Sequence, residues 1–576
     1  MISYFVSGCK GPFRITLFLP DSQPKGWVVC FPPFAEEMNK CRGMMSAQAR
    51  ALTAVDLAVV VPDLFGTGDS SGDFGDADWS TWKTDMVNLV ESIYQQGHQH
   101  VFLWGIRLGC LLALDVSNSV SRRIKRIIFW HPLPNGQQAM TQFLRLRMAA
   151  GMMEGNQEKV SDLRRQLLED NSVEVAGYDL STGLTNAIDG LSMASLAPEN
   201  VNALTWFEIS SSSEKPLSPI ARKVIDTWHQ AKVAVDSRKV LGDFFWATQE
   251  ITMVPDLISE TTGLLAVDIA EISSSGNSVA DMFEETSFSD EQFITFECND
   301  SQLAAIYHPG QSSAKRGILL VVGGPQYRVG SHRQFTLLAR DLSDAGIPVF
   351  RFDYRGMGDS TGSYIGFEGI EEDISSALDC FQKVHSELEE FVIWGLCDAA
   401  TAAAFYAPYD QRVKGIVLLN PWVRSEQGQA QSYIRHYYLD RLLSKDFWLK
   451  VIKGKYELTS SVKSFLGMVK SAKGNGAISG HNCQIDFGSG ESNLTLVQRM
   501  EDALDRFRGR VLLIISGNDL TAAEFVDASM ESKRLKSVLE DERITIEKIE
   551  DADHTFSRRI WRDEVSILTN KWIKSW

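Results

Sequence analysis

The sequence lacks several features that are typical of secreted and membrane-spanning proteins. Its eight cysteines, spread over 576 residues, form no Cys-x-x-Cys pair and no closely spaced framework, which favours a reducing compartment. The longest apolar runs, such as 317–322, have the length of a strand and are too short to cross a membrane. The N-terminus has no basic region leading into an apolar core, so we expect no signal peptide. These absences predict a cytoplasmic protein without a membrane span.

Basic residues are in the minority. The 57 Lys and Arg stand against 74 Asp and Glu, a net charge of −17. Such a charge repels phosphates, which argues against nucleic acid or an anionic membrane as the main partner. The hydrophobic fraction of 44% is enough for two full cores, and the length predicts more than one domain.

The chain contains an internal repeat. The segment 63–72 (DLFGTGDSSG) recurs at 353–362 (DYRGMGDSTG), and the segment 102–109 (FLWGIRLG) recurs at 392–399 (VIWGLCDA). Both pairs are separated by 290 positions, and a third pair of apolar segments follows at nearly the same distance. Three ordered matches with nearly the same separation predict two tandem domains of the same fold.

Each half alternates short apolar strands with helical patterns, which predicts an α/β fold with a mostly parallel sheet flanked by helices. We expect one domain at 1–271, a Ser-rich acidic linker at 272–289, and a second domain at 290–576. In the second half, strands are expected at 317–322, 348–353, 391–394, 415–420 and 511–516.

The segment 394–399 (WGLCDA) lies between an apolar strand and an Ala-rich helix. This is the setting of a nucleophile elbow, a tight turn that exposes one side chain and needs small residues on both sides. Gly395 and Ala399 supply the small residues, so Cys397 occupies the nucleophile position. The N-terminus of the following helix favours a thiolate there. The alternative is that Cys397 is a small buried apolar residue.

A nucleophilic thiol needs a base and a group that orients the base. Asp519 follows the apolar run 511–516, and His554 is the only histidine beyond residue 500. Asp553 is the nearest alternative acid, but it is adjacent to the histidine and cannot easily face its ring. The order Cys397, Asp519, His554 predicts a catalytic triad, against the alternative of a surface histidine.

An oxyanion hole should combine two backbone N–H groups. The first is that of Asp398, directly after the expected nucleophile. The second comes from the Gly-rich loop 323–332. Since Pro325 has no N–H group, Gln326 is the preferred donor, with Gly324 beside it.

The first half lacks all three triad residues. Arg107 stands where the second half has Cys397, and a guanidinium stays protonated and cannot act as a nucleophile. We therefore expect this half to be non-catalytic. Its arginine needs a partner, either Glu36 or Glu37, in an internal ion pair or, alternatively, an anion-binding site.

Long insertions at 134–197 and 422–508 are expected to form helical caps. The second cap contains aromatic and basic residues on helical patterns, which indicates either an ordinary cap helix or the lining of an acyl pocket that contacts an acidic carrier protein. The residues that would contact substrate are Tyr327, Trp422 and Tyr437.

These motifs resemble those of the α/β-hydrolase superfamily. GGPQYRVGSHRQF, FDYRGMGDS, WGLCDAA and LLNPWVR look like the exosortase A system-associated hydrolase 1 family. CFPPFAEEMNKCR, DLFGTGDSSG and LWGIRLG look like the companion hydrolase 2 family. The resemblance covers nearly the whole chain and implies a fusion of two α/β-hydrolase domains from an exopolysaccharide or envelope system, with no established substrate.

The leading hypothesis is acyl transfer, in which Cys397 attacks an ester or thioester and forms an acyl-cysteine. Water or another acceptor then resolves it. Alternatives are an acyl or aminoacyl shuttle served by an acyl carrier protein or coenzyme A, a hydrolase in which cysteine replaces serine, and a non-catalytic scaffold. We expect no metal or cofactor, and an intramolecular pseudo-dimer of the two halves.

Overall fold

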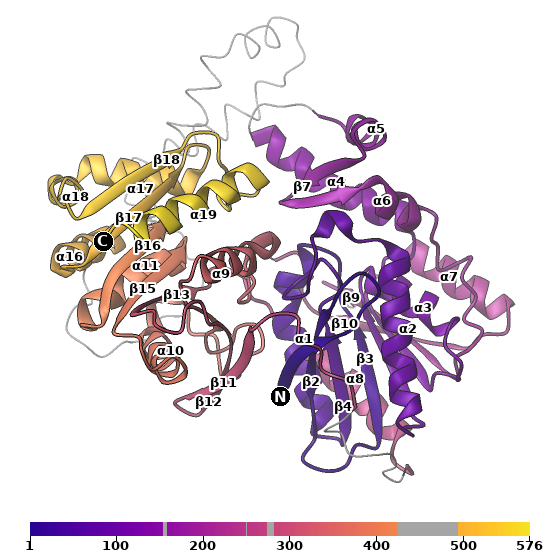
Figure 1. Ribbon diagram of the computed structural model, residues 1–576. Coiled ribbons are helices and arrows are strands. Elements are labelled where there is room, and N and C mark those ends of the chain that lie inside the picture. The colour runs from indigo at the N-terminus through magenta and orange to yellow at the C-terminus, as the bar shows by residue number, and fades with distance from the viewer. Residues whose placement is uncertain (154–157, 213, 249, 273–281, 424–493) are drawn as a thin grey trace, which may run out of the picture. The chain divides into compact units, whose positions relative to one another are not determined.

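The computed structural model describes residues 1–153, 158–212, 214–248, 250–272, 282–423 and 494–576 (Figure 1). The residues form two compact units, and each unit is built from two separate segments of the chain. The first unit holds residues 1–311 together with 324–364, and the second holds 312–323 together with 365–576. Half of the expected linker at 272–289, residues 273–281, lies outside the described residues.

The first repeat forms an eight-stranded sheet. Its strand order is β1 (Ile2–Val6), β2 (Phe13–Phe18), β4 (Leu57–Pro62), β3 (Gly26–Phe31), β5 (Val101–Ile106), β6 (Arg126–Trp130), β9 (Leu204–Ser210), β10 (Val235–Leu241). The pairs β1–β2 and β2–β4 are antiparallel, and the other pairs are parallel. The helices that flank it are α1 (Glu37–Thr53), α2 (Trp79–Gln95), α3 (Gly109–Ser117), α7 (Pro219–Gln230) and α8 (Pro255–Asp268).

Alternate side chains of β3 pack on opposite faces of this sheet. Trp27 and Val29 join the cluster formed with helices α2, α3 and α7, whereas Val28 and Cys30 join the cluster formed with α1 and α8. Because both faces are covered, the central strands are apolar along their whole length.

The insertion between β6 and β9 is a helical cap, as expected. It comprises α4 (Gly136–Met153), α5 (Val160–Asp170), the hairpin β7 (Ser172–Val175) and β8 (Tyr178–Ser181), and α6 (Thr182–Asp189).

The second repeat has the same strand order: β11 (Gln292–Cys298), β12 (Ser301–His308), β14 (Val349–Asp353), β13 (Arg316–Val321), β15 (Glu390–Leu396), β16 (Val413–Leu419), β17 (Arg510–Ser516), β18 (Ile544–Ile549). Its helices are α9 (Gln334–Asp344), α10 (Glu371–Val384), α11 (Asp398–Tyr406), α16 (Leu496–Arg506), α17 (Leu520–Glu531), α18 (Lys533–Leu539) and α19 (Arg559–Ile573). The expected fold class, two tandem α/β sheets flanked by helices, is confirmed, and the five strands expected here lie within two residues of β13, β14, β15, β16 and β17. In the described ranges, no helix combines the length and apolarity needed to span a membrane.

Candidate active site

Cys397 lies in the turn between β15 and α11, where its backbone has φ 61° and ψ −123°. A positive φ is strained for a residue with a Cβ, at a cost of about 1–3 kcal/mol, so surrounding contacts must hold it. The Cys397 N–H donates to Leu419 O at 2.8 Å, and the Trp422 N–H donates to Cys397 O at 3.3 Å. The side chain is half-buried. This is the geometry of a nucleophile elbow.

Two glycines allow the elbow to close. A Cβ on Gly395 would lie 2.6 Å from the backbone carbon of Ala399, in the first turn of α11. A Cβ on Gly323, at the end of the strand region that precedes the Gly-rich loop, would lie 2.2 Å from Asp398 Oδ1. Strand, helix and loop therefore approach one another more closely than any larger residue permits.

The second unit brings the three predicted triad side chains together. His554 Nδ1 lies 2.9 Å from Asp519 Oδ2, and Asp519 also accepts a hydrogen bond from the Ala522 N–H at 2.9 Å, which caps α17. Burial opposes the charge on Asp519, but the contact with His554 and the helix N–H groups outweigh it and lower the pKa of Asp519.

Burial likewise opposes protonation of His554. Hydrogen bonds to Asp519 and Cys397, with attraction to both groups when they are ionised, outweigh burial and raise the pKa of His554 well above its usual value. The arrangement therefore favours an imidazolium between a carboxylate and a sulfur atom, which can donate a proton to a leaving group.

Asp553, the alternative acid, has a different hydrogen-bond partner. Its carboxylate accepts hydrogen bonds from the Ser557 N–H at 2.9 Å and from the Ser557 hydroxyl. Asp519 is therefore the acid that holds the His554 ring.

Asn420 supports the site, and sequence reasoning did not single it out. It has φ 43°, and its Nδ2 donates to Ser516 Oγ at 2.7 Å and to His554 O at 3.0 Å. Its Oδ1 accepts from the Ser516 N–H at 2.9 Å. One side chain thus ties the end of β17 to the histidine loop. The Asn-Pro pair directly after a buried strand was the available signal, because Asn tolerates a positive φ.

The Gly-rich loop corrects one expectation. The Gln326 N–H donates to Gly324 O at 2.8 Å, so that N–H is engaged within the loop rather than presented as an oxyanion donor. The Gln326 side chain bonds Ser331 at 2.8 and 3.0 Å and holds the loop closed. Residues 324–364 belong to the other unit, so an oxyanion hole that pairs this loop with Asp398 stays a prediction.

The three expected substrate contacts have different positions. Tyr327 is fully buried in the core of the first unit, where it packs with the cluster of α1 and α8. Trp422 is half-buried beside the elbow, and its ring centroid lies 5.7 Å from that of Phe367. Tyr437 and most of the second cap lie outside the described residues.

The first repeat has a similar turn after β5, and the side chain at the tip of this turn is held in an ion pair. Arg107 has φ 56°, and its Nε and Nη2 both donate to Glu37 Oε1 at 3.1 Å. Its Nη1 donates to His131 O at 3.3 Å, and the guanidinium lies 4.3 Å from the Trp246 ring centroid. Trp246 follows β10 by five residues, just as His554 follows β18.

Glu37, not Glu36, is therefore the partner of Arg107. Glu36 hydrogen bonds to Asn39 and Tyr178, and burial raises the pKa of Glu36 to about 7. The nearby cavity, of about 40 Å³, is lined mainly by apolar and aromatic residues, among them Phe34, Trp82 and Leu108. It has room for only a few water molecules.

Among the described residues, no group of three or more His, Cys, Asp or Glu side chains is placed to hold a metal ion.

The titration of His554 provides a direct check of the acid–base contact. We expect its ring to titrate well above 6.5 in the native protein, and the Asp519→Asn substitution to lower that pKa. Because the folded pKa is raised, the contribution of His554 to stability is fully present below pH 6.5 and is lost as the pH rises through the folded pKa. NMR of ring-labelled histidine measures this, with His554→Gln to assign the signal. An unshifted His554 in both proteins would contradict the contact.

Comparisons with known proteins agree with this fold. The family model described as serine aminopeptidase, S33, matches residues 22–179 and 314–556, more than half of the chain. A search of curated proteins finds no match. The Pyrococcus furiosus esterase Pf2001 is 13% identical, over 50% of this chain and 92% of the esterase, with a TM-score of 0.34.

Two other solved structures give similar values. An alpha-beta hydrolase from Vibrio vulnificus is 16% identical over 49% of this chain and 81% of its own, with a TM-score of 0.31. The Pyrococcus horikoshii acylaminoacyl peptidase is 14% identical over 50% of this chain and 41% of its own, with a TM-score of 0.30. Likenesses with TM-scores this low carry no argument about this chain. Because the family model matches more than half of the chain, the chain belongs to the S33 family of α/β-hydrolases.

Proposed function

We propose that this protein is an acyl-transfer enzyme that uses Cys397, His554 and Asp519 on an ester or thioester. The observation that carries the proposal is the position of His554, 2.9 Å from Asp519 and hydrogen bonded to the cysteine of a strained strand-to-helix turn. This combination of nucleophile, base and orienting acid is what acyl transfer requires.

In the proposed reaction, the Cys397 sulfur attacks the carbonyl carbon of the substrate. The carbonyl oxygen takes up negative charge next to the Asp398 N–H at the start of α11. As the carbonyl re-forms, the bond to the leaving alcohol or thiol breaks, and protonated His554 donates its proton to that group. The product of this half is an acyl-cysteine and neutral His554.

In the second half, neutral His554 takes a proton from water or from an acceptor thiol or amine. The deprotonated acceptor attacks the acyl-cysteine, and Cys397 leaves as the thiolate. A thioester intermediate reacts readily with thiols and amines, so transfer to an acceptor competes with hydrolysis. An acyl or aminoacyl shuttle served by an acyl carrier protein or coenzyme A is therefore the second candidate.

We further propose that the first repeat is non-catalytic and pairs with the second as an intramolecular pseudo-dimer. Arg107 occupies its elbow and is held by Glu37, and Trp246 stands at the position of the histidine. The long motifs quoted above support a finer kinship with the exosortase-associated hydrolases. A cytoplasmic location fits the sequence expectations.

Intact-protein mass spectrometry with a series of acyl thioesters of coenzyme A tests the proposal. We expect an acyl adduct on wild-type protein, located at Cys397 by peptide mapping. Cys9 is an exposed free cysteine and serves as the matched control: Cys9→Ala should keep the adduct, and Cys397→Ala should lose it. The proposal would be overturned if Cys397→Ala kept the adduct. It would also be overturned if the wild-type protein formed no adduct, as expected of a non-catalytic scaffold.

A further inference from the structure

The segment that follows β16 lies where the three triad loops of the second unit meet. β16 is flanked by β15 and β17, and β18 lies beyond β17 (Figure 1). These strands are parallel, so their carboxyl ends lie at one edge of the sheet. Cys397 follows β15, Asp519 lies beyond β17, and His554 lies beyond β18. A residue directly after β16 is therefore placed between the elbow and the acid–base pair.

The backbone on either side of Asn420 holds the elbow. The Cys397 N–H donates to Leu419 O at 2.8 Å, and the Trp422 N–H donates to Cys397 O at 3.3 Å. Thr401 Oγ1, on α11, donates to Trp422 O at 2.8 Å. None of these bonds uses the Asn420 side chain, so a substitution of that side chain spares them.

The Asn420 side chain holds the histidine loop. It is fully buried, and its Nδ2 donates to His554 O at 3.0 Å and to Ser516 Oγ at 2.7 Å. The Ser516 N–H donates to Asn420 Oδ1 at 2.9 Å, and Ser516 Oγ donates to Asp553 O at 2.8 Å. Because a buried amide is costly to leave unbonded, these contacts fix the backbone of His554 relative to the segment that carries the elbow.

The loops of the acid and the histidine are also joined by bonds that do not involve Asn420. The Gly517 N–H donates to Ile549 O at 2.9 Å, and the Asn518 N–H donates to Ala552 O at 3.0 Å. The pairing of acid and histidine therefore has its own backbone support. The Asn420 amide adds the connection of this pair to the elbow.

We propose that Asn420 is a positioning residue that holds His554 at the elbow, where the imidazolium can give its proton to the leaving group. Displacements of about 1 Å in an active site can cost a large factor in rate, so one amide at this junction has a measurable effect. The proposal rests on the proposed function, because a leaving group departs only if Cys397 is acylated.

The chemistry separates this role from a merely structural one. During acylation the bond from sulfur to the carbonyl carbon forms, the bond from that carbon to the leaving oxygen breaks, and His554 gives its proton to that oxygen. A p-nitrophenolate leaves without a proton at neutral pH, whereas a p-methoxyphenolate depends much more on one. The same sulfur attacks both esters, so the ratio of the two acylation rates reports proton donation.

Asn420→Gly tests the proposal, because glycine adopts φ 43° without strain and lacks only the amide side chain. We expect acylation by p-methoxyphenyl butyrate to slow about tenfold and acylation by p-nitrophenyl butyrate to change by less than about twofold. Rapid-quench measurement of the phenol released in the first turnover gives both rates.

Gln382→Ala is the matched control in the same unit. It removes two side-chain hydrogen bonds, one to Leu388 O at 3.1 Å and one from Arg412 Nη1 at 3.2 Å. Leu388 precedes β15, at the end of the strand opposite the elbow. Both acylation rates should therefore stay near their wild-type values.

Asn420→Asp covers the case in which Asn420→Gly does not fold. Aspartate keeps the size of the side chain and the acceptor for the Ser516 N–H but loses both Nδ2 donors, so we expect the same change in the ratio. Equal losses for both esters, an unchanged ratio, the same change in Gln382→Ala, or failure of both Asn420 variants to fold would overturn the proposal. Failure of the proposed function looks different, because neither ester would then acylate Cys397 in the wild-type protein.

Discussion

Replacing Cys397 with alanine is expected to lower kcat/KM for an activated thioester by about 10⁴-fold or more. Alanine keeps the elbow backbone but removes the sulfur atom on which the proposed acyl intermediate forms. Asp519 and His554 keep their 2.9 Å contact, so the variant should fold and unfold like the wild-type protein. Steady-state hydrolysis with release of the free thiol measures the loss, and urea denaturation checks that folding is intact.

Cys397→Ser separates a required nucleophile from a required sulfur atom. An oxyester intermediate transfers poorly to thiols, so we expect hydrolysis to persist at a reduced rate and transfer to an added thiol acceptor to disappear. A hydrolase in which cysteine merely replaces serine would instead show the same product ratio in both proteins. Turnover retained by Cys397→Ala would show that the reaction occurs elsewhere in the chain.

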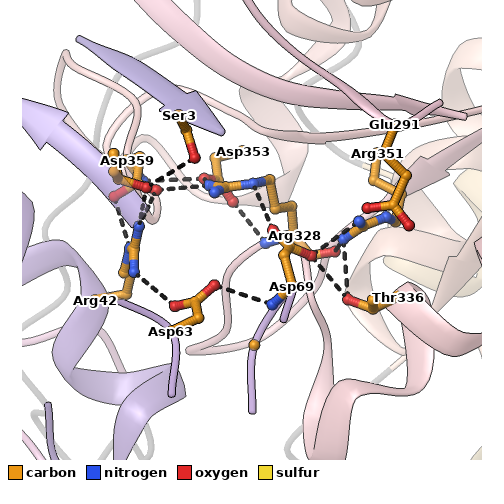
Figure 2. A network of polar contacts seen from close by, with 12 residues as sticks. Ser3, Arg42, Asp63, Asp69, Glu291, Arg328, Thr336, Arg351, Asp353 and Asp359 are labelled. Carbon is orange, nitrogen blue, oxygen red and sulfur yellow. Dashed lines mark hydrogen bonds and ion pairs between the residues drawn. The ribbon is translucent and has the colours of Figure 1, made fainter. Parts of the chain in front are cut away.

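The second large effect concerns stability rather than chemistry. Asp69→Ala is expected to lower the free energy of unfolding of the first unit by about 3–5 kcal/mol. Asp69 lies 2.9 Å from Arg351 and 3.5 Å from Arg328 (Figure 2), so the substitution leaves both guanidinium groups buried with less opposite charge. Removal of one partner from a buried ion network is strongly destabilising. The surrounding arginines hold the pKa of Asp69 well below its usual value despite burial, so the lost group is a charge.

Denaturant unfolding followed by circular dichroism measures this change. Asp359→Ala should have a similar effect, because Asp359 is the repeat equivalent of Asp69 and lies 2.7 Å from both Arg42 and Arg328. Glu169→Ala is the matched control: Glu169 is 67% exposed in an ion pair with Arg165 and should change stability by less than about 0.5 kcal/mol. An Asp69 variant as stable as this control would show that the network contributes little.

The candidate site was predictable where its signal lies within a few neighbouring residues. Apolar runs bounded by turn residues locate β15 and β17, because buried parallel strands need apolar side chains on both faces. Gly395 and Ala399 mark the elbow, because only small residues allow the helix to follow the strand so tightly. The prediction of Cys397, Asp519 and His554 follows from their places after β15, β17 and β18.

Details that depend on one conformation were not predictable. Gln326 was expected to present its N–H, but that group bonds Gly324 within a closed turn. Glu36 and Glu37 are adjacent in sequence, and only the start of α1 decides that Glu37 faces Arg107. The sequence carried only a weak indication of the role of Asn420, because its partners Ser516 and His554 lie far along the chain.

The sequence by itself determined the repeat, the α/β fold of each half, and the replacement of Cys397 by Arg107 at the equivalent position of the first half. Only the tertiary structure decided which charged residues of the two repeats bond one another in the first unit. Asp69 and Asp359 look like ordinary charged residues in the sequence, because Asp69 bonds Thr336 and Arg351, and Asp359 bonds Ser46 and Arg42, each more than 250 positions away. Burial brings these charges into one network, because a charge removed from water is stable only beside an opposite charge.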